Sequence, residues 1–368
     1  MIHLAEDTID KKDIDRLVKW LKTYPRLTQG SVVKKFESKW SEWLGRQYST
    51  FCNSGSSANL LMYQTLLSSG LLKNKLVIVP ATSWATSVMP AVQLGFEPIM
   101  CDSDPDTWGL DLVELEKLLI KHNPSTVMLV QVLGVPHKMK EIMKLKEKYG
   151  FFLLEDCCAA VGSETYQKVG TFGDMSSVSF YFGHQMSTIE GGMVSTDNKV
   201  FHELLVMSRS HGWDKEVIGD PDRPFNFCYP GYNLRSTDLN AFIGLGQLKK
   251  LKRMSLKRHK NHLLYTKLLK NNFYIQKYGE DEIISSIHFA IIAKDSNERD
   301  KIVKALRMSE IETRLYTAAN IGRHPFWVER YCESRFPVAD KLYNSGLFLP
   351  NHPSLETEDI KRIAQFVL

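Results

Sequence analysis

The pattern of apolar and polar residues changes along the chain at about residue 50. Before that point, residues 10–24 and 31–45 carry apolar side chains at helical spacing, which predicts two amphipathic helices. Beyond it, short apolar runs alternate with helical stretches such as "DLVELEKLLIKH" and "KMKEIMKLKEKYG". The apolar runs are "LVIVP" (76–80), "PIMC" (98–101), "TVMLVQVLG" (126–134) and "FFLLED" (151–156). Continuous apolar strands separated by helices predict a mostly parallel sheet covered on both faces, with ligands beyond the carboxyl ends of its strands.

After about residue 245 the composition becomes more basic. A strand–helix–strand unit follows in "SIHFAIIAK", "NERDKIVKALRMS" and "EIETRLY". We therefore expect a large domain over residues 1–244, which includes the N-terminal helices, and a small α+β domain over residues 245–368. The basic run "LKKLKRMSLKRHK" (248–260) has its charges at helical spacing and is interpreted as the solvated face of a helix.

Composition narrows the class of protein. The 368 residues are 43% hydrophobic and 24% charged, as in an ordinary globular protein, and the net charge of +5 (47 basic minus 42 acidic residues) suits an anionic small ligand. No basic stripe indicates a nucleic-acid partner, and no apolar window approaches a membrane span or a signal sequence. Six scattered cysteines without a Cys-x-x-Cys pair favour a reduced, cytoplasmic protein with no cysteine metal site and no iron–sulfur cluster.

Three segments carry residue types that suit chemistry. In "CNSGSSANLLMYQTLL" (52–67), Gly and Ser residues open an apolar-periodic helix, which is either a phosphate-binding helix start or an ordinary Ser cap. Asp156 ends a buried strand and needs a cationic partner, such as a protonated pyridine nitrogen, unless it only caps a helix. Trp84 follows another strand end, where an indole either stacks on an aromatic cofactor or packs in the core.

A phosphate cradle, a carboxylate for a ring nitrogen and a stacking aromatic are together the parts of a pyridoxal-phosphate site. They occur here in the order and approximate spacing of a known family. The chain resembles the DegT-type sugar aminotransferases over almost its whole length. The motifs that carry this resemblance are "LTQGSVVKKFE", "SGSSANL", "VPATSW", "VQVLGVP", "LEDCCAAVGS", "VGTFGDMSSVSFYF", "EGGMVST", "RSHGW", "GYNLRSTDLNAFIGLGQL" and "FLPNHPSL". The resemblance implies an α/β protein of the pyridoxal-phosphate-dependent transferase fold type I (the aspartate aminotransferase fold).

The resemblance also implies roles for individual residues by position. Asparagine in the "GYNLRSTD" motif reaches the phosphate of the neighbouring subunit in the family, which implies a homodimer with active sites shared across the interface. The implied cofactor-binding residues are Ser56 and Ser57 (phosphate, through the backbone), Ser179 (phosphate, through its hydroxyl), Asn233 (phosphate of the neighbouring subunit), Asp156 (pyridinium), Trp84 (ring face) and Gln131 (oxygen side of the ring).

Substrate contacts are expected in two further regions by the same resemblance. "RSHGWDK" contributes Arg209 and His211, and "ETRLYTAANIGRHPFW" contributes Arg314 and Arg323. Arg314 is the expected fork for a carboxylate or a diphosphate, since guanidinium geometry suits both. The alternative for each arginine is a surface or interdomain role. His352 in "LPNHPSL" is expected to be a packing residue.

The turn "FYFGHQMSTIEGGMV" (180–194) departs from the family pattern. Family aminotransferases have a lysine six residues before the Glu of Glu-Gly-Gly, and here that position is His184. The closest lysines, Lys168 and Lys199, lie outside the turn. An amine forms a Schiff base with pyridoxal phosphate and an imidazole does not, so the cofactor is expected to bind non-covalently, as pyridoxal or pyridoxamine phosphate. A neutral imidazole can still take a proton.

The Lys-to-His exchange points to dehydration rather than transamination. A base that takes the C4′ proton without returning it to the sugar carbon leaves electrons that expel a β-hydroxyl. "GHQMSTIEGG" resembles the branch of the family typified by GDP-4-keto-6-deoxy-D-mannose 3-dehydratase, although Gln185 stands where that branch has a second His. This branch implies L-glutamate as co-substrate and a GDP-linked 4-keto-6-deoxy sugar, hexose or heptose, as substrate. A 4-aminotransferase and a catalytically inactive, cofactor-binding regulatory protein remain the alternatives.

Overall fold

A seven-stranded sheet in the order β1-β7-β6-β5-β4-β2-β3 organises the first half of the chain, in a computed structural model that describes residues 1–368. Strands β2 to β6 run parallel, whereas β7 is antiparallel to both β6 and β1 at one edge. The strands are β1 (Tyr48–Cys52), β2 (Leu76–Pro80), β3 (Glu97–Cys101), β4 (Thr126–Val130), β5 (Phe152–Asp156), β6 (Met175–Ser179) and β7 (Gly192–Thr196). The predicted α/β class with a mostly parallel sheet is confirmed.

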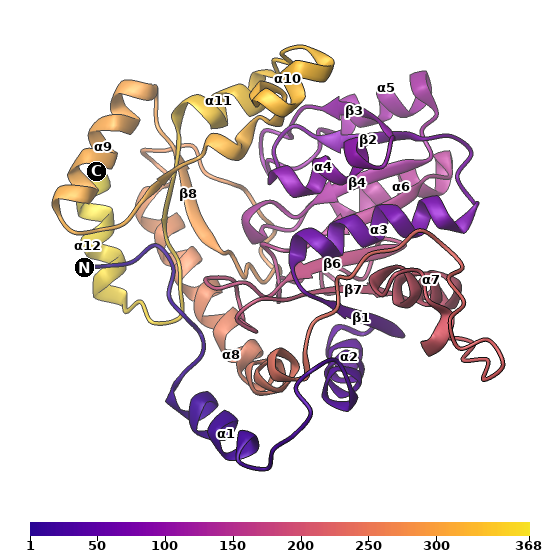
Figure 1. Cartoon of the computed structure of the whole chain (residues 1–368). Helices are drawn as coiled ribbons and strands as arrows, with labels where there is room; N and C mark the ends of the chain where they lie inside the picture. Colours follow the sequence, from indigo (N-terminus) through magenta and orange to yellow (C-terminus); the bar gives the residue numbers. More distant parts are fainter.

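Helices cover both faces of this sheet, as Figure 1 shows. On one face the buried side chains of α3, α4 and α7 form a single cluster with the strands, and on the other face α5 and α6 do the same. These helices are α3 (Gly55–Ser69), α4 (Ala85–Gln93), α5 (Leu112–His122), α6 (Met139–Tyr149) and α7 (Lys199–Arg209). Both faces of the central strands are therefore buried, which explains why their sequences are continuous apolar runs.

The second half of the chain builds a three-stranded sheet in the order β8-β10-β9, with both pairs antiparallel. Its elements are β8 (His288–Ile292), α9 (Ser296–Met308), β9 (Arg314–Leu315), α10 (Pro325–Tyr331), α11 (Pro337–Ser345), β10 (Gly346–Pro350) and α12 (Thr357–Val367). One face of this sheet is buried by α9, α12 and the end of the long helix α8 (Asp238–Leu269). Figure 1 shows α8 extending from the large sheet to the small one.

The two sheets share α8, so no loop separates them. The expected domain boundary between residues 244 and 245 falls within this helix, and the division of the chain into two domains stays a prediction. The N-terminal segment also crosses the division, because Ile2 forms an isolated parallel bridge with Ile311 and belongs to the buried cluster of the small sheet. Figure 1 accordingly places the N-terminus beside α12.

Two helices precede the large sheet, α1 (Lys11–Leu21) and α2 (Ser31–Leu44), in agreement with the helical spacing of the N-terminal segments. The basic run 248–260 is also helical, as part of α8. It is not uniformly solvated, however, because Arg258 within it is completely buried. No helix of the chain is both long enough and apolar enough to pass through a lipid bilayer.

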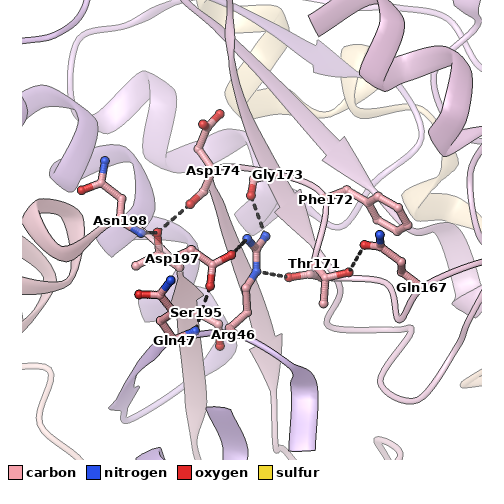
Figure 2. A network of polar contacts seen from close by, with 12 residues as sticks. Arg46, Gln47, Gln167, Thr171, Phe172, Gly173, Asp174, Ser195, Asp197 and Asn198 are labelled. Atoms are coloured by element: carbon pink, nitrogen blue, oxygen red, sulfur yellow. Dashed lines mark hydrogen bonds and ion pairs between the residues drawn. The ribbon is translucent and has the colours of Figure 1, made fainter. Parts of the chain in front are cut away.

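An arginine clamp closes one end of the large sheet, shown in Figure 2. The Arg46 side chain is buried, and it donates through Nε to the Gly170 carbonyl at 3.0 Å and through Nη2 to the Gly173 carbonyl at 2.6 Å. Its Nη1 pairs with the Asp197 carboxylate at 2.7 Å. This guanidinium ties the loop before β6 to the Asp197 side chain after β7, at the opposite end of these strands from Asp156 and Ser179.

Candidate active site

Asp156, at the carboxyl end of β5, is the one acidic residue among the predicted site residues, and its carboxylate is fixed by three hydrogen bonds. The carboxylate is 4% exposed and accepts hydrogen bonds from Asn59 Nδ2 and Ser87 Oγ, both at 2.7 Å, and from the Cys158 N–H at 3.0 Å. No lysine or arginine of the chain forms an ion pair with it. Three donors hold this carboxylate in place and no cation of the chain pairs with it, so it can accept a cationic ligand.

The start of α3 lies next to Asp156 and forms a cradle for an anion. Ser54 caps the helix by accepting from the Ser57 N–H at 3.1 Å, and the first N–H groups of the helix have no partner within it. Gly55 is in close contact with Ser179, since a Cβ at this glycine would lie 2.5 Å from the Ser179 Cβ. The structure thus brings the Ser56–Ser57 backbone and the Ser179 hydroxyl together, and this combination of N–H and O–H donors at a helix start suits a phosphate.

Trp84 caps α4 on the same side of the sheet. Its side chain is 66% exposed, unlike that of a core tryptophan, and it lies one helical turn before Ser87, which donates to Asp156. An indole exposed beside a buried carboxylate and an anion cradle can cover the face of a flat ring.

The side chain of Gln131 points away from the other predicted site residues. Its Oε1 accepts from the His137 N–H at 2.8 Å, and its Nε2 is directed to Met139 Sδ and Glu155 Oε2. Glu155 precedes Asp156 in β5 and therefore points to the opposite face of the sheet. Only the main chain of Gln131 contacts the site, because its N–H donates to the Asp156 carbonyl at 3.0 Å.

His184 lies in the turn between β6 and β7, at the same sheet edge. The ring is partly buried, its Nδ1 is buried without a hydrogen-bond partner, and the Tyr181 ring lies edge-on to it with a 6.1 Å centroid distance. The turn is held from α8, where Asn240 Nδ2 donates to the Thr188 carbonyl at 2.7 Å. It is also held by Gln185, whose Nε2 donates to the Ala159 carbonyl at 2.6 Å and the Ser285 carbonyl at 2.7 Å.

The surroundings of His184 favour the neutral imidazole. Burial, and next the nearby Arg258 guanidinium, lower the pKa of His184 from 6.5 to about 4, against the smaller effects of the Phe182 carbonyl and the Asp156 carboxylate. At neutral pH the ring is therefore uncharged and has a free nitrogen that can accept a proton. A general base in this state is available over the whole physiological pH range.

The face of the small sheet that packs against the end of β4 carries two further polar side chains, Arg314 and His288. In the strand register, Arg314 and Ala290 both pair with Phe348, so these residues share one face, and His288 lies on the same face two residues before Ala290. The His288 ring stacks on Phe348 with a centroid distance of 5.4 Å. Arg314 is exposed and forms no ion pair within the chain, which leaves its guanidinium available for a carboxylate or a phosphate.

The two other predicted substrate arginines are engaged within the chain. Arg209 is 1% exposed, and its Nη1 binds Glu37 Oε1 at 2.6 Å and the Phe51 carbonyl at 2.8 Å. Arg323 contacts Asp340 at 3.3 Å and lies over the Tyr343 ring at 4.3 Å. Both arginines therefore hold structure in this conformation, which matches the alternative considered for them from the sequence.

His211 and Asn233 are exposed on neighbouring main-chain segments, joined by the bridge between Ser210 and Asn233. His211 has a positive φ of 64°, a conformation that costs energy for a residue other than glycine. Within one chain neither side chain is buried or hydrogen-bonded. If these two residues belong to a shared site, they must contact a second copy of the chain.

With this geometry in view, comparisons with known proteins identify the family. The model of the DegT/DnrJ/EryC1/StrS aminotransferase family matches residues 7–368. This chain belongs to that family. The GDP-4-keto-6-deoxy-D-mannose 3-dehydratase of Yersinia pseudotuberculosis is 33% identical to it, over 98% of this chain and 96% of that protein. The GDP-perosamine synthase of Escherichia coli O157:H7 is 30% identical, over 92% of this chain and 90% of that protein.

Two solved structures confirm the fold. The E. coli GDP-4-keto-6-deoxy-D-mannose 3-dehydratase with bound hydrated pyridoxal phosphate superposes with a TM-score of 0.93 at 29% identity, over 100% of this chain and 99% of that chain. A GDP-4-keto-6-deoxymannose 3-dehydratase with a trapped pyridoxal-phosphate–glutamate geminal diamine gives 0.93 at 28% identity, over 100% of both chains. The predicted resemblance to this family and to its aspartate aminotransferase fold is thereby confirmed.

Sequence reasoning missed the residues that hold Asp156 within this family fold. Asn59 donates to Asp156 and accepts from Ser177 Oγ at 2.6 Å, so the amide is fixed in one orientation between two strands and a helix. Ser87 supplies the second side-chain donor. The sequence does contain one indication of this role. Asn59 lies in an otherwise apolar, buried stretch of α3, and a buried asparagine requires polar partners.

Proposed function

We propose that this protein catalyses the glutamate-dependent C3 dehydration of a GDP-linked 4-keto-6-deoxy sugar, with pyridoxal phosphate bound non-covalently. The site fits this cofactor. The start of α3 with Ser179 would hold the phosphate, Asp156 would pair with the pyridinium nitrogen, and Trp84 would cover the ring. Asn233 of a second subunit would complete the phosphate site, and Gln131 is proposed for the oxygen side of the ring, in the present geometry through its main chain.

A single observation carries the choice of reaction, namely the imidazole of His184 in the turn where the family's aminotransferases have a lysine. No lysine of the neighbouring sequence replaces it. Lys168 lies over the Trp43 ring at 5.5 Å, and Lys199 contacts Glu203 at 3.7 Å. An enzyme without that amine cannot anchor the cofactor by a Schiff base, and its base can accept a proton without completing transamination.

When bound, pyridoxal phosphate supplies an aldehyde that takes the amino group of glutamate and an electron-withdrawing ring conjugated to it. The part of this chain is to hold the ring protonated through Asp156 and to move protons through His184. Neutral His184 would accept the proton at the cofactor's C4′ and return it to the departing C3 hydroxyl. The net reaction balances: glutamate and the sugar give 2-oxoglutarate, ammonia and the 3-deoxy-4-keto sugar.

The substrate contacts are proposed from the exposed groups around the site. Arg314 is proposed to bind a carboxylate of glutamate or the diphosphate, because it is exposed and free of ion pairs on the face of the small sheet turned to the large domain. His211 is proposed to contact the sugar nucleotide across the dimer interface, and Arg209 and Arg323 to do so only if their present partners release them. GDP as the nucleotide, a homodimer and a cytoplasmic location in deoxysugar and polysaccharide biosynthesis complete the proposal.

The test is incubation with glutamate, pyridoxal phosphate and GDP-4-keto-6-deoxymannose in deuterated water, followed by mass spectrometry and NMR of the product. Loss of the C3 hydroxyl with deuterium at C3 and release of ammonia is the expected result. A 4-amino sugar product would establish the aminotransferase instead, which the 30% identity with a GDP-perosamine synthase makes the second candidate. Borohydride should attach no cofactor to the chain, whereas it would do so if a lysine held the aldehyde.

A further inference from the structure

Arg258 of α8 is completely buried and has no acidic partner. Its guanidinium is surrounded by main-chain carbonyl groups from three different parts of the chain. Nη2 donates to the carbonyl of His184 at 3.2 Å, and Nη1 donates to those of Ser286 at 3.3 Å and Ile287 at 3.1 Å, immediately before β8. Nη1 also donates to the carbonyl of Asn351, immediately after β10.

A buried guanidinium without a carboxylate is expensive, because carbonyl dipoles replace only part of its hydration. Burial lowers the pKa of Arg258 to about 9, and its Nε has no partner. An apolar side chain of similar size could fill this space and pack against the same segments, without the cost of burying a charge. The specific feature of Arg258 is that its charge and its hydrogen bonds both act on the residue proposed as the base.

We propose that Arg258 is a positioning residue for His184, which fixes the main chain of the base-bearing turn and ties that turn to the start of β8 and the end of β10 in the small sheet. The inference rests on the proposed function of His184 as the base. Asn240, also on α8, holds the far end of the same turn through the Thr188 carbonyl, so a single helix sets both ends of the segment that carries the imidazole. The position of the base therefore follows the packing of the two domains against each other.

The charged groups around His184 agree with this role. Arg258 on α8 acts to keep the imidazole neutral, and Asp156 at the end of β5 acts in the opposite direction. His288 on β8 is the third titratable group near it. Burial, followed by Arg258, Arg314 and His184, lowers the pKa of His288 to about 3, so it too is neutral at physiological pH. Arg258 is the cation among these groups that acts on both rings.

The experiment compares Arg258→Met and Arg258→Lys with the matched control Arg46→Met in the full-length dimer. Arg46 is also a buried arginine that binds two main-chain carbonyls, together with the Asp197 carboxylate (Figure 2). These partners precede β6 and follow β7, at the opposite end of the strands from Asp156 and Ser179. The readouts are the pKa of His184 from NMR titration of ¹³C-labelled histidine, the acidic limb of the pH–rate profile, kcat and KM separately, and the melting temperature. The His184 signal is assigned by its absence in His184→Asn.

The positioning role predicts a different result for each variant. In Arg258→Met, we expect the pKa of His184 to rise by about one unit, because a cation that opposes protonation is removed. The kcat should fall about 100-fold with KM changed less than about threefold. Arg258→Lys keeps the charge but not the four hydrogen bonds, so kcat should fall about tenfold with the pKa of His184 unchanged. Arg46→Met should lower only the melting temperature.

The proposal is overturned if Arg258→Met lowers the melting temperature but leaves the pKa of His184 and kcat at the values of Arg46→Met. If Arg258→Met does not fold, Arg258→Lys decides alone, and a kcat within about threefold of the wild type overturns the proposal. Failure of the proposed function looks different. In that case the wild type produces no 3-deoxy sugar, while the NMR titration, which needs no turnover, still shows whether Arg258 controls His184.

Discussion

At the scale of single residues, His184 is one of several histidines that have a buried ring nitrogen without a hydrogen-bond partner, and its position in the turn after β6 makes it the candidate base among them. His202 is a useful comparison, because burial also lowers its pKa to about 4. Its Nδ1, however, is hydrogen-bonded to Thr50 Oγ1 at 3.2 Å and its ring stacks on Tyr48, whereas the Nδ1 of His184 has no partner. A buried imidazole with a partner is explained by packing, and one with an unused nitrogen at a sheet edge is a candidate base.

We therefore expect His184→Asn to lower the rate of ammonia release by about 10³-fold, the typical contribution of a general base. His202→Asn is the matched control and should keep nearly wild-type activity. Pyridoxal phosphate should still bind to His184→Asn, as measured by absorbance titration, because the cradle and Asp156 are intact. Equal losses of activity in the two variants would contradict the assignment of the base.

The pH dependence of the half-reaction with the sugar follows from the same residue. With a pKa lowered to about 4, His184 is in its basic, neutral form at all pH values above that point. Activity should rise as the pH increases through about 4 to 5 and then stay level to neutral pH. An acidic limb near 6.5, the ordinary value for histidine, would mean that the ring is not held in this environment during turnover.

At the scale of elements, the start of α3 matters more than any side chain on it. Gly55 allows the helix to approach Ser179, and the phosphate donors proposed at this point are backbone N–H groups. Ser56 is exposed, and its hydroxyl has no hydrogen-bond partner within the chain. The geometry of the helix end, rather than the serine hydroxyl, should set cofactor affinity.

Gly55→Ala is expected to weaken pyridoxal phosphate binding at least tenfold, because the new Cβ would lie 2.5 Å from the Ser179 Cβ and must push the helix start away. Ser56→Ala keeps the backbone and should change the dissociation constant by less than about threefold. Fluorescence titration of the cofactor measures both values. A larger effect of the serine substitution would show that the hydroxyl, and not the main chain, binds the phosphate.

At the scale of the whole molecule, the site is assembled from distant parts of the chain. In the proposed site, Asp156 comes from β5, His184 from the turn between β6 and β7, and Arg314 and His288 from the small sheet, while α8 connects the two sheets. The N-terminal segment packs against the turn that carries His184, because a Cβ at Gly183 would lie 2.9 Å from the Cβ of Ala5. Asn233 is exposed on one chain, so its proposed role requires a second copy.

Subunit complementation tests this shared site. Asn233→Ala and His184→Asn homodimers should both be poorly active, since each lacks one component at both sites. When the two are unfolded, mixed in equal amounts and refolded, half of the dimers should be mixed and one of their two sites should be intact. About a quarter of wild-type activity should return. No recovery, with mixed dimers shown to be present by mass spectrometry, would place Asn233 in its own subunit's site or outside the site.

Global stability should also depend on pH through the buried histidines. Burial lowers the pKa of His137 to about 4 and that of His262 to about 3. Both folded-state pKa values lie below the unfolded value of 6.5. The stability that these two neutral, buried imidazoles contribute is therefore fully present above pH 6.5, and it is lost as the pH falls from 6.5 through the folded-state values. A shift of this size corresponds to about 3 kcal/mol per imidazole near pH 4. Urea unfolding at pH 7 and pH 5 measures the loss, and equal stabilities would contradict it.

Much of the fold was predictable because local rules decide it. The strand at 76–80 was predicted with the bounds that β2 has, and the start of β5 differs by one residue from the run "FFLLED". The buried strands are apolar on both faces and the helices are amphipathic, so periodicity alone separates them. The antiparallel pairing of β7 with β6 and β1 was not predicted, because the partner of a strand depends on contacts far along the chain.

In the candidate site, too, some features were predictable from the sequence and others were not. The sequence by itself determined the fold class, the family and the Lys-to-His exchange at position 184, because each depends on residue types at fixed local spacing. Only the tertiary structure decided that Arg209 is bound to Glu37, that the Gln131 side chain points away from Asp156, and that Arg258, read as part of a solvated helix face, is buried against His184. Burial, hydrogen-bond partners and pKa are set by residues that fold together from distant positions, and one-dimensional spacing does not contain that information.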